Sequence, residues 1–202
     1  MKQLRIALAI AALLGAGTAA AADDYAKAAA ALLKSDFKSK GPATVERVSE
    51  QDDVQKACSA SAPPTTAKAQ ALQAAQLKAV KYPLDASYLG DWKAGEKIAQ
   101  NGRGMQSSDK VGDTNGGNCY ACHQLSKEEI SFGNIGPSLY QYGKLRGNSE
   151  AVLKYTWAKL YNAQAFNICS RMPRFGHNGV LTEQQIKDVM ALLLDPQSPV
   201  NK

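Results

Sequence analysis

The sequence has 202 residues, which is enough for one domain with a sizeable core, or for one domain and an appendage. Its 24 lysines and arginines outnumber its 18 aspartates and glutamates, for a formal charge of +6, and the basic residues are dispersed rather than clustered with aromatic side chains. This distribution of charge is not that of a nucleic-acid-binding protein. It fits an ordinary surface or one biased toward an acidic protein partner.

Residues 1–22 have the pattern of an export signal. Lys2 and Arg5 form a basic start, an apolar run follows, and the small residues up to Ala22 offer cleavage sites. The apolar run is shorter than the roughly 20 residues that a membrane-spanning helix needs. We therefore predict a cleaved signal peptide, a periplasmic location and no stable membrane insertion, with a formal charge of +4 after cleavage. A retained N-terminal anchor is the alternative.

Residues 23–90 are rich in alanine, lysine and glutamine and poor in large apolar residues. Pro63 and Pro64 divide this segment into two helix-prone stretches, at roughly 24–39 and 66–80. Because the segment has too few large apolar residues for a core of its own, we predict an N-terminal extension. It should pack on the following domain or on a partner.

Residues 91–202 form a second region, which is predicted to be a helical domain. Asp91 can cap a helix that starts here, and Gly102 can end it. Gly95 lies inside this predicted helix, where glycine costs about 1 kcal/mol relative to alanine. We therefore expect another helix to cross closely at Gly95.

Helical spacing of apolar residues returns at 149–166 and again near the C-terminus, and no alternating strand pattern is present from residue 91 onward. The predicted fold class is therefore all-α. The last helix is expected to have a capping box, an apolar stripe and a terminating proline. These residues are Thr182, Gln185, Ile186, Val189, Met190, Leu193 and Pro196.

The stretch GGNCYACHQL contains the motif CxxCH, formed by Cys119, Cys122 and His123. A redox dithiol belongs to an α/β setting that this sequence lacks. A structural zinc site needs four ligands, usually from two local pairs, and beyond the motif only His177 and two scattered cysteines are available. In an exported helical domain the motif is the attachment pattern of c-type haem.

We therefore predict a cytochrome c-type domain around one covalently attached c-type haem. Cys119 and Cys122 would form the thioether bonds, and His123 would be the proximal iron ligand. The second ring nitrogen of such a histidine needs an acceptor that fixes its orientation. The carbonyl of Pro137 is a candidate, while the alternative that Gly136 and Pro137 only form a turn stays open.

The sixth iron ligand decides whether the iron only transfers electrons or also binds small molecules. Met172 lies in the stretch CSRMPRFGHNG, where Pro173 prevents a helix from continuing. We predict Met172 as the second axial ligand, because an extended stretch lets its thioether reach the far face of the haem. The competing candidates are Met105, Met190, His177 and Cys169.

Cys58 and Cys169 remain if the motif uses the other two of the four cysteines. Exported proteins meet an oxidising compartment in which cysteines usually end as disulfides. We therefore predict a Cys58–Cys169 disulfide, which would hold the extension beside the predicted ligand loop. Iron ligation or sulfur chemistry at Cys169 is the alternative.

Four stretches together resemble SoxX, the smaller cytochrome subunit of the SoxAX complex in bacterial thiosulfate oxidation. They are YLGDWKAGEKIAQNGRGMQ, GNCYACHQL, GNIGPSLYQYGKLRG and YNAQAFNICSRMPRFGHNGVLTEQQIKDVMALLLDPQSPVN. The resemblance covers residues 88–202 closely. The preceding segment is similar to the N-terminal extension of the longer members of that family.

The resemblance implies covalent haem at Cys119 and Cys122 and axial ligation by His123 and Met172. It further implies a SoxA-like partner that bears the substrate site, where thiosulfate is joined oxidatively to a cysteine of a carrier protein. The present chain would then be the electron-accepting subunit of an L-cysteine S-thiosulfotransferase, passing electrons to a soluble cytochrome. Two alternatives are a free-standing monohaem shuttle and a haem that acts as a peroxidase or gas binder.

Overall fold

The computed structural model describes residues 24–202. The predicted signal peptide, residues 1–22, lies outside the described residues. Within them, regular structure is helical apart from one isolated antiparallel bridge between Lys40 and Ala43. The predicted all-α fold is confirmed. No helix in the described part of the chain is long and apolar enough to cross a membrane.

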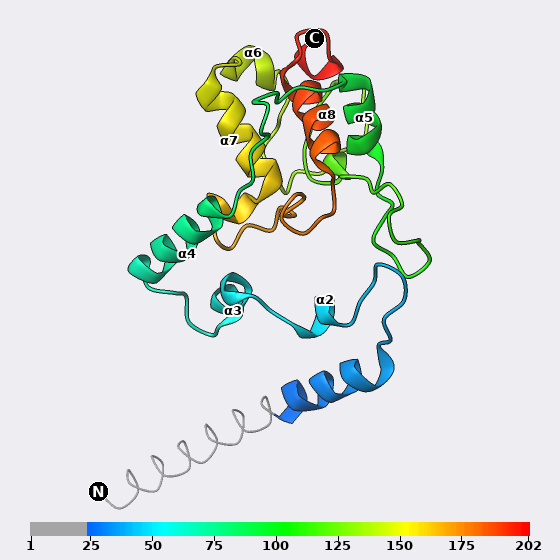
Figure 1. Ribbon diagram of the computed structural model, residues 1–202, viewed down its shortest axis with the longest axis vertical. Helices are drawn as coiled ribbons and strands as arrows, with labels where there is room; N and C mark the ends of the chain where they lie inside the picture. The colour runs from blue at the N-terminus through cyan, green and yellow to red at the C-terminus, as the bar shows by residue number, and fades with distance from the viewer. Residues whose placement is uncertain (1–23) are drawn as a thin grey trace, which may run out of the picture.

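In Figure 1 the first part of the N-terminal extension, residues 24–59, runs beneath the rest of the molecule. The extension begins with an exposed helix over 24–36 and continues through three further helices, of which α3 starts at a complete capping box. These are α2 (Glu46–Ser49), α3 (Asp53–Ser59) and α4 (Thr66–Lys78). The helix over 24–36 and α4 were expected from the sequence, whereas α3 was not.

The second region contains the helices that form the core. They are α5 (Trp92–Gln100), η1 (Cys119–Ala121), α6 (Tyr142–Arg146), α7 (Glu150–Tyr161), η2 (Ala163–Ala165), α8 (Glu183–Leu194) and η3 (Pro199–Asn201). In Figure 1, α5 and α8 lie next to each other, with α6 and α7 on the other side of α8. The predicted helix at 149–166 is shorter than expected, because it ends at Tyr161 and a 3₁₀ turn follows.

The pair formed by α5 and α8 crosses at Gly95, as predicted. A Cβ atom at Gly95 would lie 2.1 Å from the backbone oxygen of Asp188 and 3.1 Å from the Cβ of Leu192. Only glycine permits this approach. The buried carboxylate of Asp188 also accepts a hydrogen bond from the backbone N–H of Asp91, which links the start of α5 to the middle of α8.

The predicted features of α8 are confirmed. Thr182 and Gln185 form the capping box, with 3.2 Å between the backbone nitrogen of Gln185 and the hydroxyl of Thr182. The predicted apolar stripe is buried, and Met190 lies fully within the core. Burial of this face on α5 and α7 stabilises the helix more than its intrinsic propensity does.

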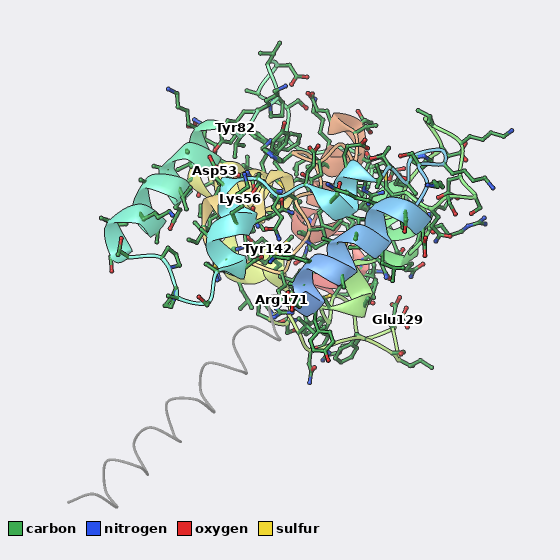
Figure 2. The ribbon with its side chains drawn as sticks, turned by 90° about the horizontal axis from the view of Figure 1, so that it is seen from below. Asp53, Lys56, Tyr82, Glu129, Tyr142 and Arg171 are labelled. Atoms are coloured by element: carbon green, nitrogen blue, oxygen red, sulfur yellow. A yellow bond between two sulfur atoms is a disulfide. The ribbon has the colours of Figure 1, made fainter. Side chains whose placement is uncertain are left out.

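The part of the extension after α4 is built into the same core. Val80 and Tyr88 belong to the core cluster, and the Tyr88 ring meets Trp157 of α7 edge-on with 5.8 Å between ring centroids. The indole N–H of Trp157 donates to the carbonyl of Lys81 at 2.8 Å. The extension therefore packs on the helical domain through polar and apolar contacts, and Figure 2 shows its helices crossing the lower face.

Candidate functional site

The CxxCH motif forms a single helical turn. Asn118 precedes it in the left-handed region with φ 48°, which turns the chain after the loop that follows α5. The carbonyl of Cys119 then accepts hydrogen bonds from the N–H groups of Cys122 at 3.1 Å and His123 at 2.9 Å. Both thiols and the imidazole are therefore presented by the same turn.

The imidazole of His123 is held by the backbone of the segment that follows. Its Nδ1 lies 2.7 Å from the carbonyl oxygen of Pro137. Because a carbonyl oxygen can only accept, this hydrogen bond places the ring proton on Nδ1 and leaves the lone pair of Nε2 available for a metal. Pro137 thus occupies the acceptor position that the sequence suggested.

Gly136 makes this arrangement possible. Its N–H donates to the carbonyl of Cys122 at 2.8 Å, so its backbone is fixed against the motif. A Cβ atom at this position would lie 2.1 Å from Cε1 and 2.5 Å from Nδ1 of His123. Since ordinary carbon–carbon contacts are about 3.5–4.0 Å, only glycine leaves room for the ring.

The environment of Cys119 argues against a redox dithiol. Cys119 and Cys122 are both free, and burial raises the pKa of the Cys119 thiol to about 12. Reactive dithiols instead have a thiol pKa lowered by nearby positive charge or a helix N-terminus. Within residues 24–202, no group of three or more histidine, cysteine or acidic side chains is arranged to hold a metal ion.

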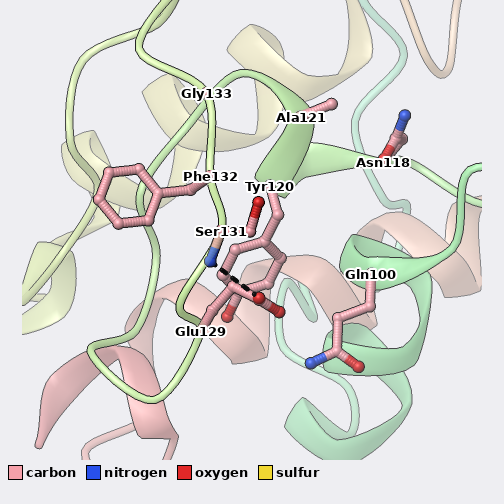
Figure 3. Close-up of a pocket in the computed structure, with 8 residues that line it drawn as sticks. All are labelled: Gln100, Asn118, Tyr120, Ala121, Glu129, Ser131, Phe132 and Gly133. Carbon is pink, nitrogen blue, oxygen red and sulfur yellow. Dashed lines mark hydrogen bonds between the residues drawn. The ribbon is translucent and has the colours of Figure 1, made fainter.

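The loop after the motif exposes large apolar side chains beside this turn. Ile130 is 96% exposed and Ile135 is 76% exposed, although the loop is fixed by a hydrogen bond from the N–H of Gly133 to the carbonyl of Tyr120 at 2.8 Å. Figure 3 shows Phe132 on this loop, facing away from Tyr120. Exposed apolar side chains are suited to contact with a large apolar group or with a partner protein.

A cavity of about 470 Å³ adjoins the same turn, with Tyr120 and Ala121 among its lining residues. Figure 3 shows Gln100 at the end of α5, Asn118 and Glu129 around it, with the carboxylate of Glu129 accepting from the N–H of Ser131 at 3.2 Å. Its lining is mostly polar, in contrast to the exposed side chains of Ile130 and Ile135 on the same loop.

Met172 lies in a non-helical stretch between η2 and α8, and the chain bends at this residue. It is partly buried against the core cluster, and its backbone N–H donates to the hydroxyl of Ser170 at 3.3 Å. The competing methionines are engaged elsewhere: the sulfur of Met105 accepts a hydrogen bond from Asn115 at 3.5 Å, and Met190 is a core residue. His177 is exposed on the loop beyond Met172.

Cys58 and Cys169 are joined by a disulfide, with 1.98 Å between the sulfur atoms and 5.5 Å between the Cα atoms. A second connection between the same segments was not anticipated. Arg174 Nη1 donates to Asp52 Oδ2 at 2.6 Å, and the guanidinium is buried. The two residues are 122 positions apart, and no local sequence pattern reveals such a pair.

Two free thiols and an oriented imidazole on one turn of a helical domain, beside an apolar surface, fit covalent attachment of haem. These features define the class of c-type cytochromes. The chain belongs to the cytochrome c family, whose model matches residues 93–195. It carries a covalently bound c-type haem and has the fold of an electron-transfer protein.

A relative is described as an uncharacterized lipoprotein of Aquifex aeolicus (strain VF5). The two chains are 42% identical over 157 residues, which is 75% of this chain and 73% of the relative. The matched length exceeds the cytochrome c segment alone, so the similarity includes part of the N-terminal extension.

Proposed function

We propose that this protein is the electron-accepting cytochrome subunit of a periplasmic SoxAX-type L-cysteine S-thiosulfotransferase. The observation that carries the proposal is the turn of Cys119, Cys122 and His123, with an imidazole whose Nε2 is directed to a metal by the hydrogen bond to Pro137. The resemblance of residues 88–202 to SoxX supports the proposed role in thiosulfate oxidation. Membership of the cytochrome c family supports the role in electron transfer.

In this proposal, Cys119 and Cys122 hold the haem through thioether bonds, and His123 and Met172 are its axial ligands. The cofactor supplies one-electron oxidation and reduction of its iron. Pro137 and Gly136 keep the imidazole oriented, which limits the rearrangement that accompanies a change of iron charge. A methionine ligand raises the reduction potential relative to a second histidine, so Met172 suits a protein that accepts electrons.

The chemical conversion is assigned to a SoxA-like partner. A sulfur–sulfur bond forms between thiosulfate and the cysteine thiol of a carrier protein, the thiol proton is lost, and two electrons are released. The present chain has one CxxCH motif, so it would receive these electrons singly and pass each to a soluble cytochrome. The substrate site is therefore expected on the partner subunit.

The apolar side chains on the loop after the motif are the proposed contact surface for these redox partners. Ile130 and Ile135 are strongly exposed, and they lie within six residues of the Gly136–Pro137 pair that holds His123. Burial of such side chains supplies most of the favourable energy in protein association. Placement next to the turn would bring a partner close to the haem edge.

Export to the periplasm, with cleavage of a signal peptide within residues 1–22, completes the proposal. The disulfide between Cys58 and Cys169 fits an oxidising compartment. The printed description of the Aquifex relative as a lipoprotein also indicates an exported protein. N-terminal sequencing of the mature protein that began near residue 23 would support cleavage, and a start at residue 1 would contradict it.

The test is purification from the native periplasm followed by mixing with thiosulfate and carrier protein. The proposal predicts that the chain elutes with a second haem protein and that its haem is reduced only when thiosulfate and the carrier thiol are both present. A free-standing shuttle would elute alone and show no such dependence. Binding of carbon monoxide to the reduced protein would instead favour a gas-binding or peroxidase role.

A further inference from the structure

The loop that contains Met172 is attached to helix α3 on both sides. Three residues before Met172, Cys169 is bonded to Cys58 near the end of α3. Two residues after it, Arg174 forms its 2.6 Å ion pair with Asp52 at the start of the same helix. One seven-residue helix of the extension therefore holds both ends of a six-residue stretch around Met172.

Helix α3 is itself well fixed. The side chain of Asp52 accepts from the N–H of Gln55 at 2.8 Å, and the side chain of Gln55 accepts from the N–H of Asp52 at 2.9 Å. On its inner face, Val54 and Ala57 are buried. A capped helix with a buried face is a firmer attachment point than a loop would be, so movement of the Met172 stretch is restrained at two positions.

The two side chains of the ion pair differ in their exposure to solvent. The Arg174 side chain is only 8% exposed, whereas that of Asp52 is 38% exposed. A guanidinium removed from water needs a partner, and loss of that partner is more costly than loss of an exposed pair. Release of Asp52 from Arg174 would therefore leave a buried charge unpaired and favour local opening of the loop.

The two attachments are chemically independent. The disulfide lies near the surface, with Cys58 partly buried and Cys169 exposed, and it depends on the redox conditions. The ion pair depends on charge. Each restrains the same short stretch, because the ion pair joins Arg174 to Asp52 and the disulfide joins Cys169 to Cys58.

We propose that α3 acts as a clamp, through Asp52–Arg174 and Cys58–Cys169, that holds the Met172 thioether in position and opposes its dissociation from the iron. The inference rests on the proposed role of Met172 as an axial ligand. Asp52 and Arg174 are positioning residues in this account. The extension then supports the electron-transfer site directly, because an iron with both axial positions occupied by protein ligands exchanges electrons without ligand exchange.

The clamp is tested on the holoprotein by binding of imidazole to the ferric form, since imidazole can bind only when Met172 has dissociated. Two variants remove one attachment each: Asp52→Asn, which keeps a good helix cap, and the double variant Cys58→Ser/Cys169→Ser, which leaves no free thiol. Each should bind imidazole about tenfold more tightly, equivalent to about 1.4 kcal/mol. Without imidazole, each should keep the far-red absorption band that a methionine thioether bound to ferric haem iron gives.

Two controls separate local opening from general destabilisation. Glu150→Gln removes an exposed ion pair with Lys154 on α7 and should leave imidazole affinity unchanged. Val200→Ala creates a cavity at a fully buried position of the core and should lower global stability without changing imidazole affinity. A rise in affinity in Val200→Ala equal to that in the clamp variants would overturn the proposal.

The outcomes also distinguish the clamp from the ligand assignment. Met172→Ala should abolish the far-red band. If the band persists, Met172 is not the iron ligand, and the proposed role of α3 in holding it is refuted as well. If the band depends on Met172 but either clamp variant binds imidazole as the wild type does, the ligand assignment stands and the two-point clamp is refuted.

Discussion

Gly136→Ala is the substitution that most directly perturbs the orientation of His123. The added Cβ would lie 2.1 Å from Cε1 and 2.5 Å from Nδ1 of the imidazole, and 2.7 Å from Nε2. Ordinary contact distances between carbon atoms are about 3.5–4.0 Å. The ring or the backbone must therefore move by more than about 1 Å, because both sides of residue 136 are tied to the motif.

The size of the effect follows from what this movement removes. Overpacking of a fixed site costs about 1–3 kcal/mol. Loss of the 2.7 Å hydrogen bond between His123 and Pro137 adds about 0.5–1.5 kcal/mol. We expect Gly136→Ala to destabilise the holoprotein by about 1.5–4.5 kcal/mol in chemical denaturation, and to change the haem absorption spectrum because the imidazole no longer has its preferred orientation.

Gly147→Ala is the matched control. Nothing lies within 4 Å of a Cβ at Gly147, but its φ of +72° is unfavourable for alanine. Because its ψ is −167°, Gly147 lies in a region that is nearly restricted to glycine. This variant should lose about 1–3 kcal/mol of stability from backbone strain and keep the wild-type haem spectrum. The reasoning is refuted if Gly136→Ala has a wild-type spectrum and unfolds within about 0.5 kcal/mol of the parent.

Three further predictions concern stability. Removal of the disulfide by Cys58→Ser/Cys169→Ser should lower the unfolding free energy by roughly 4–5 kcal/mol in the chain-entropy model, given the 111-residue separation; an unchanged denaturation midpoint would contradict this. Burial alone would raise the pKa of Asp52, but hydrogen bonds from the Gln55 N–H and from Arg174 lower it overall. The stability that the Asp52 charge contributes is therefore present above the ordinary carboxyl pKa and is lost as the pH falls through the lowered pKa. The stability difference between wild type and Asp52→Asn should therefore shrink on acidification, and a difference that grew would refute the assignment. Met190→Ala should cost about 2–5 kcal/mol through a core cavity, while the far-red band persists; loss of that band would place Met190 rather than Met172 at the iron.

The parts of the fold that sequence predicted are those with local signals. The capping box of Thr182 and Gln185 marks the start of α8 by residues three positions apart. Gly95 predicted a close helix crossing because its cost in a helix interior needs a compensating contact, although the partner α8 could not be named from that residue. The motif at Cys119–His123 likewise predicted covalent haem attachment from five consecutive residues.

The features that were missed depend on distant contacts or weak local preference. Helix α3 has a capping box, yet its seven residues show too short an apolar pattern to be distinguished from a loop. Helix α6 spans five residues and begins after Gln141 in the left-handed region, with no side-chain cap. The Asp52–Arg174 pair forms only when folding brings the extension to the loop of Met172, so its energy is tertiary in origin.

The apolar surface beside the motif illustrates a different limit. The sequence EEISFGNIG contains apolar residues at irregular spacing, which does not indicate whether they are buried. In the structure, Ile130 and Ile135 are exposed because the backbone of Gly133 and Gly136 is held against the motif and directs the loop outward. Their role follows from their position rather than from periodicity.

Covalent haem attachment can be tested by peptide mass spectrometry of the mature protein purified from its native periplasm. The peptide containing Cys119, Cys122 and His123 should carry the added mass of one haem, and the haem should stay attached after denaturation. The same peptide with two unmodified cysteines, or with a disulfide between them, would contradict covalent haem attachment at this turn and the electron-transfer function built on it.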